Sequence, residues 1–398
     1  MFCVACLSRA TRAARGMRAR CSGAGDGERT RAPAGLAARD SPLRNLLDDA
    51  SAFGEARPED AELQWATLPY AAAPSERQAA LRVDPRETTV LLFPGQGAEH
   101  VGMGRQLKDV PAARQLYDLA SEVLGWDVWR VCTEGPAAEL ARRVQPCVLV
   151  TSLAALERAR DERPGAVAGA RAAAGFSLGE LAALVAAGAL RLEDALRFAE
   201  LRAAAMAAAA AERPGGMLTV WLAPDAELPH ALLRAREHAA ERGVAGAVCA
   251  VANYLFPGCK VVAGDEAALA WLEREGARFG VRRAARVRVA GAFHCALMER
   301  TRAPLAAALR ALDVRAPRLA VWACTEAARY ADAGHVRRGL ARLAARPVRW
   351  EQTLQALYAR PRGLAPPRTL ALGPGAALRS TLRHVNARAW DSSLQVHV

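Results

Sequence analysis

The chain has 398 residues, 52% of them hydrophobic and 5% aromatic, which is enough for two or three domains with a sizeable core. No apolar run reaches membrane-spanning length without a charge, so we expect no membrane span. The net charge is +13, but nearly all cations are arginines. No zinc-finger spacing or basic helix with interleaved aromatic residues accompanies them, which argues against a nucleic-acid partner.

The nine cysteines are scattered, odd in number, and without the spacing of a disulfide framework. Cysteines of this kind are typical of buried free thiols in a reducing compartment. No cluster of histidine and cysteine indicates a metal ion, so we expect none.

The first 25 residues contain several arginines, with serine and threonine, and no acidic residue. This composition predicts an organellar transit peptide over 1–25, most simply one for the mitochondrial matrix. An arginine tail that reflects composition alone is the alternative. Residues 26–86 are rich in alanine, proline, arginine and acids, and we expect an N-terminal extension or linker there.

Strands and helices alternate from residue 87 onward. Thr89–Phe93 is an apolar strand that Pro94 and Gly95 end. Helices are predicted over 105–124 and 137–160, a strand over 166–174, and helices over 178–211. This order predicts a largely parallel sheet with both faces covered.

The pattern changes near residue 213. Strands are predicted at 217–223, 247–253, 260–263 and 282–289, with helices at 225–242 and 266–279, which is the ferredoxin-like order βαββαβ. A helix at 297–312, a strand at 319–323, helices to about 360, a strand at 369–372 and a final helix follow. We therefore predict a large subdomain, 87–212 and 291–390, interrupted by a small ferredoxin-like subdomain, 213–290.

A G-x-S-x-G motif, with Ser177 at its centre, lies between a predicted strand and a predicted helix. This context is typical of the nucleophile elbow of a hydrolase-like α/β core, where small residues tolerate the sharp turn. The fold class is therefore α/β, a hydrolase-like parallel-sheet core with an inserted ferredoxin-like βαββαβ subdomain. Because the chain is rich in alanine and glycine, chance occurrence of the motif is the alternative.

A serine nucleophile needs a base, and the chain has seven histidines. His294 stands out because it follows Gly291-Ala292-Phe293, where the chain returns from the predicted insertion to the main subdomain. Such junctions are common places for clefts. An ordinary, partly buried histidine is the other interpretation.

Several motifs then occur in the order of one known family, and the chain resembles the mitochondrial, vertebrate-like malonyl-CoA:acyl carrier protein transacylases over about residues 88–390. The motifs that carry the resemblance are Phe93-Pro94-Gly95-Gln96-Gly97, Gly175-Phe176-Ser177-Leu178-Gly179-Glu180, Arg202, Gly291-Ala292-Phe293-His294, Pro347-Val348-Arg349-Trp350 and Gly373-Pro374-Gly375.

The resemblance implies a two-step acyl shuttle. Ser177 would take the malonyl group from malonyl-CoA and pass it to the pantetheine thiol of an acyl carrier protein, with His294 as the base. It also implies an oxyanion hole made by the backbone N–H groups of Gln96 and Leu178, and a backbone carbonyl at Arg349 that orients the histidine.

The resemblance further assigns the pocket. Arg202 would bind the free carboxylate of the malonyl group, Phe293 would limit branched acyl chains, and Gln145 and Asn253 would flank the site. It implies no cofactor beyond the CoA and pantetheine arms of the substrates, and we expect a monomer. Because acyl carrier proteins are acidic, arginines between 278 and 288 are candidate docking contacts.

Three positions depart from the commoner family pattern: Phe176, Leu255 and Cys324. Two rival functions remain open. A serine thioesterase or esterase of hydrolase-like fold shares the elbow and would use a histidine near the C-terminus such as His384, but it leaves Arg202 without a role. A non-enzymatic subunit that binds carrier protein would not need the nucleophile.

Overall fold

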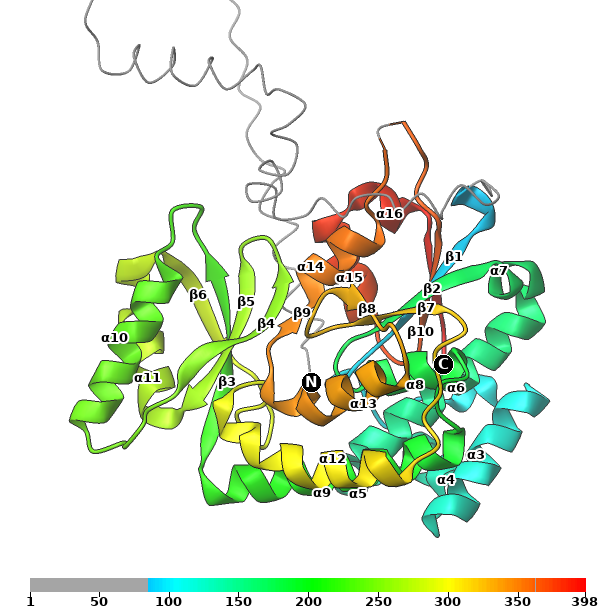
Figure 1. Cartoon of the computed structure of the whole chain (residues 1–398), viewed down its shortest axis with the longest axis horizontal. Coiled ribbons are helices and arrows are strands. Elements are labelled where there is room, and N and C mark those ends of the chain that lie inside the picture. The colour runs from blue at the N-terminus through cyan, green and yellow to red at the C-terminus, as the bar shows by residue number, and fades with distance from the viewer. Residues whose placement is uncertain (1–84, 362) are drawn as a thin grey trace, which may run out of the picture. The chain divides into compact units, whose positions relative to one another are not determined.

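The computed structural model describes residues 85–361 and 363–398, which contain two β-sheets with helices around them (Figure 1). The predicted transit peptide, 1–25, and nearly all of the extension, 26–86, lie outside the described residues.

The first sheet is the expected hydrolase-like core. Its strand order is β11-β10-β1-β2-β7-β8, and all neighbours are parallel except β7 and β8. Every residue of the central strand β1 is buried, as expected for a parallel strand covered on both faces. The strands are β1 (Thr89–Phe93), β2 (Ala170–Gly175), β7 (Ala320–Ala323), β8 (Ala328–Arg329), β10 (Arg368–Leu372) and β11 (Ser393–Val396).

Helices pack on this sheet and bury its apolar side chains in one large core. Helix α8 contacts β1 and β2, while α6 contacts α8, β10 and β11. The helices outside the second sheet are α3 (Pro111–Leu124), α4 (Val128–Thr133), α5 (Ala137–Arg142), α6 (Val144–Glu162), α7 (Pro164–Ala168), α8 (Gly179–Ala186), α9 (Leu192–Glu212), α12 (Arg302–Ala311), α13 (Ala333–Arg342), α14 (Trp350–Leu357), α15 (Ala377–Val385) and α16 (Ala387–Asp391). Short 3-10 helices are η4 (Pro85–Glu87), η5 (Arg105–Leu107), η6 (Gly276–Phe279), η7 (Ala296–Thr301) and η8 (Leu343–Ala345).

The second sheet has the order β6-β3-β5-β4-β9, and its first four strands are antiparallel, which confirms the ferredoxin-like arrangement. Helices α10 and α11 cover one face (Figure 1). Side chains alternate along the strands: Leu218 and Val262 pack toward these helices, whereas Met217 and Val261 join the main core. The elements are β3 (Gly215–Leu222), α10 (Leu228–Glu241), β4 (Cys249–Phe256), β5 (Cys259–Asp265), α11 (Glu266–Glu275), β6 (Val281–Arg286) and β9 (Val348–Arg349).

Strand β9 comes from the second part of the large subdomain and pairs in parallel with β4, which the sequence did not predict. The second sheet is therefore not built from 213–290 alone. The subdomain boundaries themselves stay predictions.

Three element predictions need correction. The segment 166–174 is not one strand, because Pro164 starts the short helix α7 and the strand begins only at Ala170. The helix predicted over 105–124 begins at Pro111, again at a proline suited to a first helical turn. The terminal strand β11 was missed because four residues with mixed burial give little periodicity.

Neighbouring parallel strands bring two loops together. Phe93 of β1 pairs with Gly175 of β2, so the segment containing Gln96 and the turn containing Ser177 leave the same edge of the sheet. Ligands of open α/β sheets bind at the carboxyl ends of the strands. Among the helices of the described residues, we find none with the length and apolar character to cross a membrane.

Candidate active site

Ser177 lies on a sharp turn between β2 and α8. Its φ is +52°, in the left-handed region that L-residues rarely adopt. The flanking glycines make this turn possible: a Cβ on Gly175 would come within 1.9 Å of the Gly179 carbonyl carbon, and one on Gly179 within 2.2 Å of Phe93 O. The motif is therefore a nucleophile elbow in structure as well as in sequence.

The loop after β1 packs against this elbow. The N–H of Phe176 donates to the Phe93 carbonyl at 3.0 Å, and a Cβ on Gly95 would come within 2.4 Å of Phe176 O. Within the described residues, the backbone N–H groups of Gln96 and Leu178 have no hydrogen-bond partner. Both donors are thus available beside the serine.

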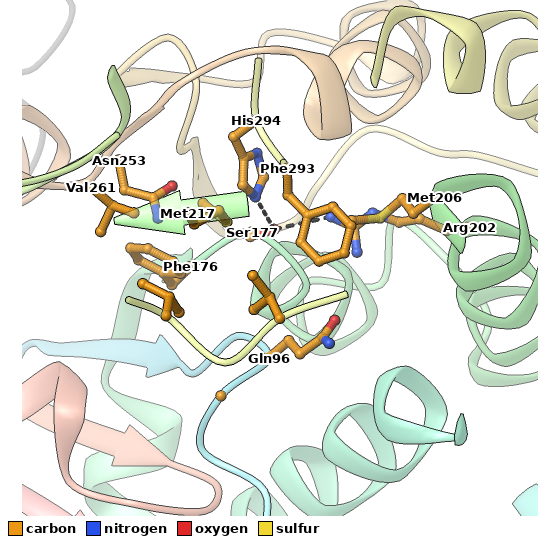
Figure 2. Close-up of a pocket in the computed structure, with 13 residues that line it drawn as sticks. Gln96, Phe176, Ser177, Arg202, Met206, Met217, Asn253, Val261, Phe293 and His294 are labelled. Atoms are coloured by element: carbon orange, nitrogen blue, oxygen red, sulfur yellow. Dashed lines mark hydrogen bonds between the residues drawn. The ribbon is translucent and has the colours of Figure 1, made fainter. Parts of the chain in front are cut away.

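His294 approaches the serine from the other side (Figure 2). Its Nε2 lies 2.8 Å from Ser177 Oγ, and its Nδ1 lies 2.9 Å from Leu343 O and 3.1 Å from Arg346 O. Carbonyl oxygens only accept, so Nδ1 carries the proton and Nε2 accepts from the serine hydroxyl. The backbone is held as well: His294 has φ +62°, and its N–H donates to Ala344 O at 2.8 Å.

The carbonyl predicted to orient the histidine was assigned to the wrong residue. Arg349 O lies at the start of α14 and accepts from Thr353 Oγ1 at 2.8 Å, and the Arg349 N–H donates to Cys324 O. The orienting carbonyls instead belong to Leu343, in η8, and to Arg346. No side chain marks a backbone acceptor in a sequence, so only the fold reveals them.

The imidazole of His294 is neutral at physiological pH. Burial, and secondarily the positive charge of Arg202, lower its pKa to about 4. Hydrogen bonds to the Leu343 and Arg346 carbonyls oppose this shift. The group is therefore able to accept a proton above that pH.

Arg202, on α9, is 1% exposed and lines the same pocket. Its Nη1 donates to Gln145 Oε1 and its Nη2 to Ser177 Oγ, each at 2.9 Å. Its Nε has no hydrogen-bond partner, and no carboxylate of the described residues forms an ion pair with it. Burial lowers the pKa of the guanidinium to about 10, so it remains charged. A buried cation with a spare donor suits a carboxylate ligand.

The pocket is otherwise mostly apolar. Phe293 and Met206 lie beside Arg202, and Asn253 faces the cavity from β4 (Figure 2). The Oδ1 of Asn253 is buried and without a partner, as expected for an amide that contacts a ligand. The remaining lining residues are Gln96, Gly97, Phe176, Ser177, Met217, Val261, Val287, Val289 and His294.

Three predicted site residues do not line the pocket. Leu178 is buried in the core, Gln145 acts behind Arg202, and Arg349 lies outside. Met206 was missed, although its spacing of four residues from Arg202 places it on the same helix face. Within the described part of the chain, histidine, cysteine and acidic side chains form no group able to hold a metal ion.

The departures from the common family pattern have structural explanations. Phe176 packs edge-to-face on the buried Trp350, with ring centroids 5.5 Å apart. Leu255 is buried in the core. The N–H of Cys324 donates to the buried carboxylate of Glu180 at 2.7 Å.

His384, the base that a hydrolase would require, is an exposed residue of α15. Its ring stacks on Phe256, and Nδ1 donates to Ser380 O within its own helix. The serine hydroxyl faces His294 instead. The geometry therefore gives no support to the esterase arrangement.

The acyl transferase domain model matches residues 90–363. A probable mitochondrial malonyl-CoA-acyl carrier protein transacylase of Drosophila melanogaster is 42% identical over 340 residues, covering 85% of this chain and 90% of the fly protein. The human mitochondrial malonyl-CoA-acyl carrier protein transacylase is 43% identical over 316 residues, covering 79% and 81%. The chain belongs to the malonyl-CoA-acyl carrier protein transacylase family.

Solved structures of the family share this fold. The acyl-carrier-protein S-malonyltransferase of Burkholderia pseudomallei has a TM-score of 0.68 at 31% identity, covering 78% of this chain and 96% of that one. A malonyl-transacylase in complex with its type II PKS acyl-carrier protein has a TM-score of 0.68 at 28% identity, covering 77% and 94%. This transacylase-family chain is thus an α/β acyltransferase with its serine, histidine and arginine in one pocket.

Proposed function

We infer that this chain transfers the malonyl group of malonyl-CoA to the phosphopantetheine thiol of an acyl carrier protein, through a malonyl ester of Ser177. One observation carries this conclusion: Ser177 Oγ lies 2.8 Å from His294 Nε2 and 2.9 Å from Arg202 Nη2. A nucleophile in contact with both a base and a buried cation suits an acyl group that ends in a carboxylate.

In the first half-reaction, His294 Nε2 accepts the hydroxyl proton while Ser177 Oγ attacks the thioester carbon. The backbone N–H groups of Gln96 and Leu178 are the donors available to the oxyanion. The C–S bond then breaks, and the CoA sulfur leaves with the proton from His294. The products are free CoA and the malonyl-serine ester.

In the second half-reaction, the pantetheine thiol of the carrier protein gives its proton to His294. Its sulfur attacks the ester carbon, and the C–O bond to Ser177 breaks. Ser177 Oγ regains the proton from His294, so the enzyme is unchanged after one cycle.

Arg202 would select the acyl group by pairing with its free carboxylate. An acetyl group has none and leaves the buried guanidinium without that partner. Charge-assisted hydrogen bonds contribute about 1.5–3 kcal/mol each, so the preference for malonyl is expected to be roughly ten- to a hundredfold or more. Phe293, Gln145 and Asn253 complete the proposed binding residues.

The physiological role we propose is the supply of malonyl groups to mitochondrial fatty acid synthesis in the matrix. Two considerations support it: the relatives from fly, human and mouse are named mitochondrial, and residues 1–25 have the composition of a transit peptide. A monomeric enzyme remains our prediction.

The test is formation of malonyl-carrier protein from malonyl-CoA by the wild type, Ser177→Ala and His294→Ala. We expect no transfer by the serine variant and a loss of about 10²–10⁴-fold without the base. Release of CoA by hydrolysis, without transfer, would indicate a thioesterase. Undiminished biological activity of Ser177→Ala would indicate a binding subunit.

A further inference from the structure

Glu180 is a buried acidic residue that the reaction steps above do not use. It lies three residues after the nucleophile, in the first turn of α8, and is 1% exposed. Burial raises the pKa of its carboxyl, and burying a carboxylate is costly unless other groups stabilise its charge. A carboxylate at this position therefore requires nearby groups that stabilise its charge.

The Glu180 carboxyl accepts hydrogen bonds from two residues at the β7–β8 hairpin. Cys324 N–H donates to Oε2 at 2.7 Å, and the Tyr330 hydroxyl donates to Oε1. Tyr330 is fixed in turn, because its N–H donates to Val321 O at 2.9 Å and its hydroxyl fills space that a side chain on Gly339 would occupy. Both oxygens accept from donors, which is the pattern of an ionised carboxylate.

Glu180 and Arg202 both contact Ser177: the Glu180 N–H donates to Ser177 O at 3.0 Å, and Arg202 Nη2 donates to Ser177 Oγ at 2.9 Å. Burial raises the pKa of Glu180, while the hydrogen bonds from Tyr330 and Cys324, and then the positive charge of Arg202, lower it. The other titratable groups around Glu180 are Tyr330 and Cys324, and burial raises the pKa of both well above neutrality, so both are uncharged. Burial lowers the pKa of the Arg202 guanidinium, and Cys324 and then Glu180 oppose this shift. Because the Cys324 thiol is uncharged, the negative charge comes from the Glu180 carboxylate. The two residues form no direct ion pair, since Arg202 donates to Gln145 and Ser177 instead.

We propose that Glu180 is the resident counter-charge of Arg202, anchored by Tyr330 and Cys324 so that it stabilises the guanidinium without occupying the position needed by a carboxylate ligand. A glutamate in direct contact would compete with the acyl carboxylate, whereas no anion at all would leave a buried, uncompensated cation. This inference rests on the proposed function, because it takes the malonyl carboxylate as the ligand of Arg202. Glu180 is thus a residue that tunes specificity without touching the substrate.

The test compares equilibrium binding in a Ser177→Ala background, where no acyl transfer takes place. Calorimetry gives the dissociation constants of malonyl-CoA and acetyl-CoA with Glu180 and with Glu180→Gln. Removing the resident anion strengthens the attraction of Arg202 for a ligand carboxylate. We therefore expect the malonyl-CoA dissociation constant to fall by about three- to tenfold while that of acetyl-CoA is unchanged.

Two control variants separate charge from structure. Glu180→Asp keeps the charge, and malonyl-CoA should bind within about twofold of the background. Glu351→Gln removes a largely buried carboxylate that is paired with Lys260, and should leave the ratio of the two constants unchanged. Three results with Glu180→Gln would overturn the proposal. The dissociation constants of malonyl-CoA and acetyl-CoA could change equally, neither could change, or malonyl-CoA could bind more weakly. Equal affinity for both ligands in the background alone would instead contradict the proposed function.

If Glu180→Gln folds but is too unstable for calorimetry, its free energy of unfolding tests the same pair of charges. In a double-mutant cycle, Glu180→Gln and Arg202→Gln each leave one buried charge uncompensated, while the double variant removes both. Chemical denaturation should show the double variant to be more stable than the sum of the single effects predicts. Additive effects would overturn the proposal.

Discussion

Nη2 of Arg202 donates a 2.9 Å hydrogen bond to Ser177 Oγ, the oxygen that also lies 2.8 Å from His294 Nε2. Arg202 additionally helps to lower the pKa of His294. A carboxylate bound to the guanidinium offsets its charge, so it should raise the pKa of the base. Recognition of the acyl carboxylate and the strength of the base are therefore coupled through one residue.

Arg202→Gln should remove the preference for malonyl-CoA. The variant loses charge-assisted hydrogen bonds to the carboxylate, and we expect kcat/KM for malonyl-CoA to fall by roughly 10- to 150-fold. The value for acetyl-CoA should change far less. Steady-state kinetics with both substrates measure the ratio, with Arg197→Gln on the exposed side of α9 as the control. An unchanged ratio would show that Arg202 does not bind the carboxylate.

The pH profile should report the buried base. Because the pKa of His294 is lowered to about 4, the rate of enzyme acylation should stay high as the pH falls below 6.5. The rate should decline only as the pH approaches 4. Arg202→Gln removes one cause of the lowering, so its acid limb should shift to higher pH. Single-turnover CoA release between about pH 4 and 8 measures the acid limb of the wild type and that of Arg202→Gln. An acid limb that does not move, or moves down, would contradict the coupling.

The same shift affects stability. Between about pH 6.5 and pH 4, the unfolded chain protonates this histidine while the native protein does not. The free energy of unfolding should therefore decrease as the pH falls through this window. His294→Asn should flatten this part of the stability profile, measured by denaturant titration. An identical slope in the variant would mean that the imidazole is not buried in its neutral form.

Gly179→Ala should abolish the elbow. The added methyl group would lie 2.2 Å from Phe93 O and 2.7 Å from Pro94 O, both backbone atoms that cannot move independently of β1. We expect a lower Tm and loss of enzyme acylation. Gly165→Ala is the matched control, because no atom beyond its chain neighbours and its own helix backbone lies within 4 Å of the added Cβ, and it should be neutral or stabilising by up to about 1 kcal/mol. Equal melting temperatures for the two variants would refute the steric argument.

Exposed arginines on and after β6 are candidate contacts for an acidic carrier protein. Arg282 and Arg288 are exposed, and Arg288 lies between Val287 and Val289, which both line the pocket. Reversing both charges should raise KM for carrier protein several-fold at low salt, and less at high salt. Arg171→Glu, at the amino end of β2, is the control. If acylation by malonyl-CoA slows equally, the arginines act on CoA and the docking prediction is wrong.

Much of this site was predictable because it is encoded in side chains at fixed spacings. The elbow glycines are required sterically, and His294 follows the predicted ferredoxin-like insertion, so the sequence already indicated a cleft between the two subdomains as the place for Ser177 and His294 to meet. Arg202 needed the family resemblance, since one arginine among many carries no signal of its own. The alternation of strands and helices likewise predicted both sheets.

What escaped prediction depends on tertiary contacts. The carbonyls of Leu343 and Arg346 act through the backbone, so their side chains gave no indication, and Arg349 was chosen wrongly. The role of Glu180 depends on a hairpin about 150 residues away in the chain, which is not visible in local sequence. Strand β9 is only two residues long and has no periodicity to detect.

We infer that Ser177 carries the malonyl group between two thiols. Intact-mass measurement of the purified protein, without its N-terminal segment, after incubation with malonyl-CoA tests it most directly. We expect one malonyl adduct on the wild type, none on Ser177→Ala, little adduct with acetyl-CoA, and discharge of the malonyl adduct when holo-acyl carrier protein is added. A malonyl adduct that persists on Ser177→Ala, or one that carrier protein fails to discharge, would contradict it.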